Sequence, residues 1–269
     1  MTLASPIDRA PDRRPERRVL TAVEFDVLWE WLGLGATPAV LRISSPGRTH
    51  EERRRVVAGG WQGLRTRGLA DIGGPDPELV RLLHRLVAPA EQVEVRMRLD
   101  RELRILAAGR PGAVAVAVRQ DETVTLSGAA DAVAAVLDPL PRLPAGPGGS
   151  VTVSSRDLDH ATGRGVESVV EALTARGLPG RDAELLDAVF AAGTGRGQIG
   201  VLATDPWGLP RRHRRVLGLV DTRRGRYLMH RSEAADGAEW TTLTPVDHTT
   251  LTHRVRRLLR DAHRNAAGH

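Results

Sequence analysis

An internal duplication constrains the fold of this chain more than any other feature of its sequence. The block Leu64-Arg-Thr-Arg-Gly68-Leu69 returns as Leu173-Thr-Ala-Arg-Gly177-Leu178. Each block is followed by an amphipathic helix pattern, by runs of alternating small and β-branched residues, and by a final amphipathic stretch. Repeated sequence of this kind predicts two similar halves that share or abut one core.

A constant offset aligns the two halves. The apolar stripe Leu82, Leu83, Leu86 and Val87 is followed 103 positions later by Leu185, Leu186, Val189 and Phe190. The same offset places Val114 and Val116 on Leu217 and Leu219, and Val124 and Leu126 on Tyr227 and Met229. These pairs predict one helix and two strands that are equivalent in the two halves.

Capping signals and periodicity indicate the elements of each half. Helices are expected after the capping boxes at Thr21 and Thr49, after Asp76-Pro77, after Ser154, after Asp182 and after 244–247. Strands are predicted at 93–99, 114–118, 124–126 and 199–203, and a short helix at 129–137. Because consecutive strands lack intervening helices, antiparallel pairing is favoured. The predicted class is α+β: a pseudo-twofold duplicated unit with a central antiparallel β-sheet, flanked by helices and a C-terminal helical region.

Composition shifts along the chain suggest its organisation. Residues 1–18 are rich in Pro, Arg and Asp, which predicts a disordered tail. The first repeat unit is expected at 19–142 and the second at 151–264, joined by a Pro/Gly linker at 143–150. Together the two units are expected to form one compact globular domain.

The absence of cysteine excludes disulfides and thiolate metal sites. No uncharged apolar stretch approaches the roughly 18 residues of a membrane helix, and the N-terminal residues lack the apolar core of a signal peptide. We therefore expect a cytoplasmic protein with no membrane partner.

The net charge is +6, and all 39 basic residues are arginines, as GC-rich codon usage favours. The excess positive charge lies in 211–231 and 254–264. An alternative function is therefore a basic nucleic-acid-binding protein that places these arginines on phosphates. However, only Trp207, Tyr227 and Trp240 supply nearby stacking groups and no nucleic-acid motif is present, so nucleic acid is not the expected partner.

No catalytic constellation emerges from the residues. Gly195-x-Gly197-x-x-Gly200 matches a dinucleotide fingerprint, but a predicted helix precedes it and a predicted strand follows, which is the wrong context. We interpret it as a helix end followed by a glycine loop. The sequence has no Gly-x-Ser-x-Gly elbow, and His248 and His253 are five positions apart with no intervening Glu. A non-enzymatic protein without a metal or small-molecule cofactor is predicted.

The segment from Asp205 to Pro210, followed by Arg211-Arg-His-Arg-Arg215, is typical of a long hairpin loop between two strands. Its predicted counterpart in the first unit is 100–112. Trp207, beside four arginines, is either an anchor for a partner or a loop tryptophan folded back on its own sheet.

Several segments share an order and spacing with one known family. They are Leu20-Thr-Ala-Val-Glu-Phe25 with Leu28-Trp29, Pro38 with Thr49-x-x-Glu52-Arg53, Leu64-x-x-Arg-Gly-Leu69, Leu79-x-x-Leu82-Leu83, the strands near 114–126, Leu137-x-x-Leu140-Pro141, and Gly197-Gln198-Ile199. Over roughly 19–264 the chain resembles the EspG family, the secretion-associated proteins of actinobacterial type VII (ESX) secretion.

The resemblance implies a quasi-twofold α/β fold and a cytosolic, non-enzymatic chaperone. Such a protein binds the hydrophobic tip of a PPE-type helical secretion substrate, usually with a PE partner, and keeps it soluble until the secretion ATPase receives it. A WXG-like helical substrate is the other partner that we consider.

The resemblance also implies a contact surface on the sheet and the C-terminal helical region, which no short motif marks. We expect the surface in the second unit. The predicted partner-binding residues are Gln198, Val201, Trp207, Arg211, Arg212, Leu217, Leu219, Tyr227 and Met229. On this interpretation, Leu219→Arg abolishes substrate binding and leaves the fold intact.

Overall fold

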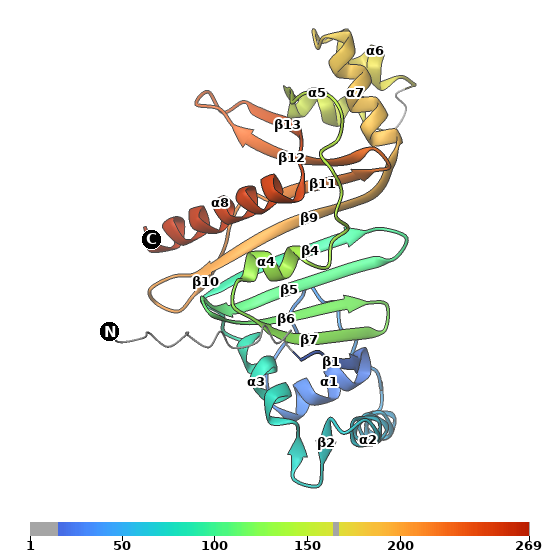
Figure 1. Ribbon diagram of the computed structural model, residues 1–269, viewed down its shortest axis with the longest axis vertical. Coiled ribbons are helices and arrows are strands. Elements are labelled where there is room, and N and C mark those ends of the chain that lie inside the picture. The colour runs from blue at the N-terminus through green and yellow to red at the C-terminus, as the bar shows by residue number, and fades with distance from the viewer. Residues whose placement is uncertain (1–15, 164–166, 269) are drawn as a thin grey trace, which may run out of the picture.

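The computed structural model, which describes residues 16–163 and 167–268, contains one long, twisted antiparallel sheet with helices at both ends and across its middle (Figure 1). Its strand order is β1-β7-β6-β5-β4-β9-β11-β12-β13-β8, and β10 pairs with β9. The first half comprises β1 (Arg18–Thr21), α1 (Ala22–Trp31), α2 (His50–Thr66), β2 (Ala70–Asp71), β3 (Gly74–Pro75), α3 (Pro77–Arg85), β4 (Glu91–Arg98), β5 (Glu102–Arg110), β6 (Ala113–Gln120), β7 (Thr123–Ala129) and α4 (Ala132–Leu137). The second half comprises β8 (Val151–Ser154), α5 (Ser155–Ala161), α6 (Val169–Thr174), α7 (Gly180–Ala191), β9 (Gly193–Thr204), β10 (Pro210–Arg212), β11 (Leu217–Thr222), β12 (Gly225–Glu233), β13 (Glu239–Pro245) and α8 (His248–Ala267).

The strand order is a pseudo-twofold arrangement centred between β4 and β9. Counted outwards from this pair, β5, β6, β7 and β1 on one side match β11, β12, β13 and β8 on the other. In each half an edge strand is followed by three helices, four strands of the sheet's main path and one helix, with β2, β3 and β10 as additions. The predicted α+β class with a central antiparallel sheet is confirmed.

The strand equivalences predicted from the offset of 103 positions are wrong. That offset fits α3 and α7, but it aligns β6 with β11 and β7 with β12. In the pseudo-twofold strand order, the equivalent of β6 is β12 and the equivalent of β7 is β13. The error arose because β5, which carries Ala107-Ala108-Gly109, was not predicted as a strand. Residues 100–112 are therefore mostly strand, and the true counterpart of the 205–216 segment is the short turn between β4 and β5.

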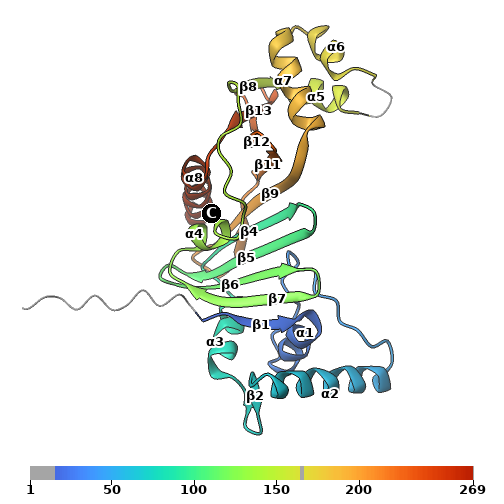
Figure 2. The ribbon, with the colours of Figure 1, turned by 45° about the vertical axis from the view of Figure 1, so that its right-hand side comes forward.

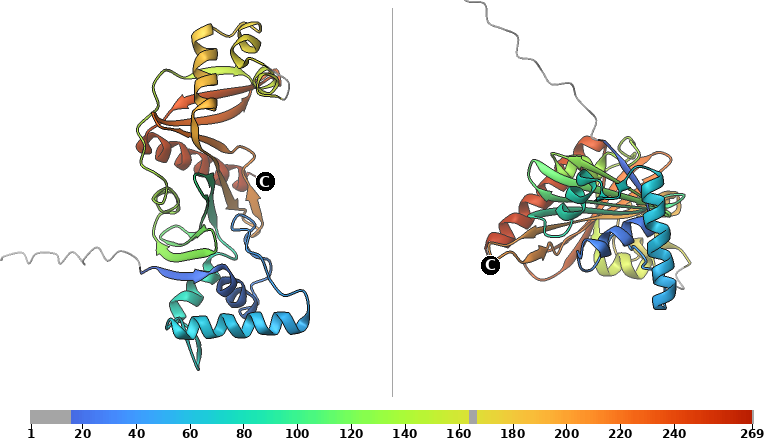
Figure 3. Two further views of the ribbon diagram at one scale, coloured as in Figure 1. Left: turned by 90° about the vertical axis from the view of Figure 1, so that its right-hand side faces the viewer. Right: turned by 90° about the horizontal axis from the view of Figure 1, so that it is seen from below.

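The sheet has two faces that differ in their cover. On one, which we call the closed face, α4 and α8 pack over the central strands and enclose one core with Val95, Ile199 and Leu219. On the other, the open face, α1–α3 cover β6 and β7, and α5–α7 cover β8, β11, β12 and β13. Figure 2 shows α1–α3 and α5–α7 at opposite ends of the molecule, and Figure 3 (left) shows α8, in red, crossing its middle.

The central strands meet closely at Gly197, which lies in β9 opposite Met97 of β4. A Cβ atom at Gly197 would lie 2.5 Å from both the carbonyl oxygen of Arg96 and the sulfur of Met97. Gly195, Gly197 and Gly200 thus belong to a strand, which corrects the predicted helix-end loop; the dinucleotide interpretation still lacks its strand–loop–helix context.

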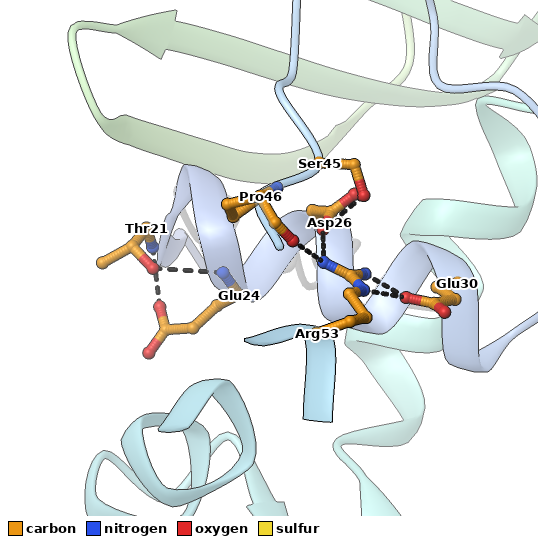
Figure 4. A network of polar contacts seen from close by, with 7 residues as sticks. All are labelled: Thr21, Glu24, Asp26, Glu30, Ser45, Pro46 and Arg53. Carbon is orange, nitrogen blue, oxygen red and sulfur yellow. Dashed lines mark hydrogen bonds and ion pairs between the residues drawn. The ribbon is translucent and has the colours of Figure 1, made fainter. Parts of the chain in front are cut away.

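The first helix group is tied together by Arg53 of α2 (Figure 4). Its Nη1 donates to Asp26 of α1 at 2.6 Å and to the carbonyl oxygen of Pro46 at 3.1 Å, and its Nε donates to Glu30 at 2.9 Å. One guanidinium therefore fixes two helices and the loop between them.

The predicted capping boxes at Thr21 and Thr49 both form, so α1 and α2 begin where the sequence indicates.

Other helix starts were predicted with mixed success. Asp76 caps α3 with Pro77 at the first helical position, and Ser154 caps α5. Asp182 is not a cap: α7 begins at Gly180 after Pro179, with Asp182 in its first turn. Most of the predicted tail, residues 1–15, lies outside the described residues, and Arg18 already belongs to β1.

The Pro/Gly segment at 143–150 is fastened to β12. Pro144 accepts a hydrogen bond from the amide of Arg226, and Gly146 donates to the carbonyl of Arg226. The Tyr227 hydroxyl donates to the carbonyl oxygen of Pro147 at 2.7 Å. The side chain of Arg226 forms a separate contact: its guanidinium donates to both carboxylate oxygens of Asp221, at 2.6 and 2.7 Å, and both residues are buried.

Candidate functional site

The open face of β4 and β9 carries a strip of polar side chains, which we call the central strip: Glu94, Arg96, Arg98, Arg196 and Gln198. The β4 members alternate with Val93, Val95 and Met97, which point to the closed-face core. In the register of the two strands, Arg98 lies opposite Arg196 and Arg96 opposite Gln198. Because α1–α3 and α5–α7 cover the strands on either side, the strip is the floor of the space between the two helix groups.

Glu94 organises one end of this strip. Its buried carboxylate accepts hydrogen bonds from Arg212 of β10 at 2.5 Å and from Gln92 at 3.2 Å. The hydrogen bond with Glu94 raises the pKa of Arg212, although burial opposes the shift. This ion pair ties β10 to the central strands.

On β5, next to the strip, the carboxylate of Glu102 is also paired with an arginine. Arg104 donates to Glu102 at 2.5 Å and to the carbonyl oxygen of Val40 at 2.8 Å. The hydrogen bond from Arg104 lowers the pKa of Glu102, and Arg42 and Arg98 act in the same direction. Both carboxylates beside the strip are thus held by arginines other than Arg98 and Arg196.

The structure separates the predicted partner-binding residues into distinct environments. Val201, Leu217 and Leu219 are buried in the closed-face core, and Tyr227 is buried in the core beneath α5–α7. A partner cannot reach these four side chains in this structure. The expectation that Leu219→Arg leaves the fold intact is therefore wrong.

The remaining predicted residues lie at or near the surface. Gln198 and Arg212 both lie on the open face, and Met229 lies partly buried where that face meets the α5–α7 core. Trp207 and Arg211 lie farther along, on the segment between β9 and β11. Sequence reasoning missed Glu94, Arg96, Arg98 and Arg196; the alternation along β4 indicated an exposed face but not that helices leave it open.

The Trp207 side chain is 68% exposed, so it does not fold back on its own sheet. Its loop is fixed by Asp205, whose carboxylate accepts from the amides of Trp207 and Leu209 and from the side chain of Arg211. Burial opposes ionisation of Asp205, but the hydrogen bonds from Leu209, Arg211 and Trp207 outweigh it and lower the pKa of this carboxyl. The loop therefore presents Trp207 and Leu209 to solvent on an ordered support.

Half of the eight arginines of 211–231 are paired with carboxylates. Arg211, Arg212, Arg226 and Arg231 each pair with a carboxylate: Asp205, Glu94, Asp221 and Asp159, respectively. Such pairing removes half of the eight positive charges that suggested phosphate binding. The interpretation as a nucleic-acid-binding protein therefore loses much of its support.

A hollow of about 780 Å³ lies between α4 and the β6–β7 hairpin. It is lined mainly by small side chains, and its Asp131 caps α4 and pairs with Arg256. Within 16–163 and 167–268, no three His, Asp or Glu side chains are grouped as metal ligands. None of the helices described for the chain is both long and apolar enough to span a membrane.

Comparison with known proteins identifies the family. The EspG family model matches residues 21–257, and the chain belongs to the EspG family. A solved structure of the Mycobacterium tuberculosis type VII secretion system chaperone EspG5, in complex with a PE25–PPE41 dimer, has the same fold: the TM-score is 0.72 at 18% identity, covering 92% of this chain and 96% of that one. No curated protein matches the sequence.

Proposed function

We propose that this chain is a cytosolic, non-enzymatic chaperone of type VII secretion that binds a helical substrate of the PPE or WXG type. One observation carries the proposal: the central strands are closed by α4 and α8 on one face and left open between two helix groups on the other. The related EspG5 structure is a complex with a PE25–PPE41 dimer, which supports a partner of this class.

The geometry suits a docking role. A sheet floor with helices on both sides can receive the end of a helical bundle, and its rigid strands need no rearrangement to do so. The exposed Trp207 and Leu209 offer apolar contacts at the end of the β9–β10 hairpin. Covering an apolar substrate tip prevents its self-association, which is the physical basis of a holding chaperone.

Co-expression tests this proposal. A PPE-type protein encoded beside this chain, produced with its PE partner, is expected to become soluble and to co-elute with this chain in size-exclusion chromatography. Without the chain, a larger share of the same substrate should aggregate because its apolar tip is uncovered. If neither PPE-type nor WXG-type neighbours bind or gain solubility, the chaperone assignment is wrong.

A further inference from the structure

The central strip concentrates positive charge where the two halves meet. Arg98 and Arg196 lie directly opposite each other on β4 and β9, and both are exposed. Like charges at directly opposed positions destabilise an antiparallel pair. Arg96, in the next row of the same face, faces Gln198 on one side and Arg104 on the other.

The carboxylates among the described residues neutralise only part of the charge of this cluster. Within the described residues, neither Arg98 nor Arg196 forms an ion pair with a carboxylate, and Arg196 instead donates to the carbonyl oxygen of Phe190. Glu102 lies opposite Arg98 but is bonded to Arg104, and Glu94 is 4.0 Å from Arg96 but closer to Arg212. The buried Nε of Arg96 has no hydrogen-bond partner.

We propose that Arg96, Arg98 and Arg196 form a carboxylate-binding site, and that the substrate tip docking on the open face presents acidic side chains to it. This inference rests on the proposed function and adds the chemistry of the contact. Guanidinium groups bind carboxylates through paired hydrogen bonds, and a substrate carboxylate would relieve the repulsion between Arg98 and Arg196. A protein carboxylate fits better than a nucleic-acid backbone because the cluster is short and has a helix group on either side.

Charge reversal tests the site with the co-purified PPE-type substrate as the probe. Arg98→Glu and Arg196→Glu are each expected to weaken binding by about ten- to a hundredfold, and the wild-type affinity is expected to fall with rising salt. Arg257→Glu, an equal charge change at an exposed position on α8, is the matched control and should leave affinity unchanged. Arg98→Gln, which adds no charge, should have a smaller effect, and circular dichroism verifies the fold of every variant.

A swap identifies the partner group directly. Replacing an acidic residue of the substrate tip by arginine should weaken binding to the wild-type chain and restore binding to Arg98→Glu.

If the substrate binds the wild-type chain but neither reversal nor salt changes its affinity, the carboxylate site is wrong and the chaperone function stands. If the reversals abolish binding of a single-stranded oligonucleotide and leave substrate affinity unchanged, the cluster serves nucleic acid and the proposal is overturned. Failure of the wild-type chain to bind any substrate would refute the function itself.

Discussion

Replacing Arg226 by methionine is expected to lower the free energy of unfolding by about 3–5 kcal/mol, because it leaves the buried carboxylate of Asp221 without its partner. Arg226 and Asp221 are 1% and 2% exposed and are joined by two hydrogen bonds across the β11–β12 hairpin. Urea unfolding followed by circular dichroism measures the change.

Two further variants distinguish a buried pair from a general effect of removing arginine. Arg231→Met removes an arginine whose pair with Asp159 is about half exposed, so a change within about 1 kcal/mol is expected. Combining Arg226→Met with Asp221→Leu removes both charges and should recover most of the lost stability. A loss of less than about 1 kcal/mol for Arg226→Met alone would contradict the burial of this pair.

Leu219→Arg is expected to destabilise the chain by roughly 4 kcal/mol or more, because it places an unpaired charge in the closed-face core. Thermal unfolding should show a midpoint lower by roughly 8–16 °C, together with a smaller soluble fraction.

Gln120→Arg is the matched control for this substitution. It introduces the same side chain at an exposed position at the end of β6, opposite Leu103 and Thr123, where stability should change by no more than about 0.5 kcal/mol. If Leu219→Arg proves as stable as the wild-type chain, the closed face is not the core described here. Because Leu219→Arg is expected to destabilise the core, a loss of substrate binding in this variant would report unfolding and not a lost contact.

Local signals in the sequence predicted much of the fold. The capping boxes at Thr21 and Thr49 and the Asp76-Pro77 start work through residues one to three positions apart, so they can be recognised without tertiary context. Strand β4 was predicted because one of its faces is apolar and the other polar, which produces alternation.

Strand β5 was missed for the opposite reason. Seven consecutive residues, Leu103 to Gly109, are buried, so no alternation marks the strand, and Ala107, Ala108 and Gly109 have little strand preference. Without β5, the repeat was aligned one strand out of register. Strand β13, rich in threonine, was also not predicted.

The candidate surface was harder to predict than the fold. Val201, Leu217 and Leu219 have the apolar character of a contact surface, but the same character suits a core, and only the packing of α8 decides between them. Likewise, nothing local shows that no helix covers Arg98 and Arg196. Which strand faces remain open is a property of how the two halves assemble.

The central claim, that the substrate docks on the open face between the two helix groups, is best tested by cysteine protection. Because the chain has no cysteine of its own, Gln198→Cys and the control Arg257→Cys each introduce a single thiol, at exposed positions on opposite faces. In the free chain both should react with a maleimide reagent. In the complex with the PPE-type substrate, labelling at position 198 should be strongly slowed and labelling at position 257 unchanged; equal labelling at position 198 with and without substrate would contradict the account.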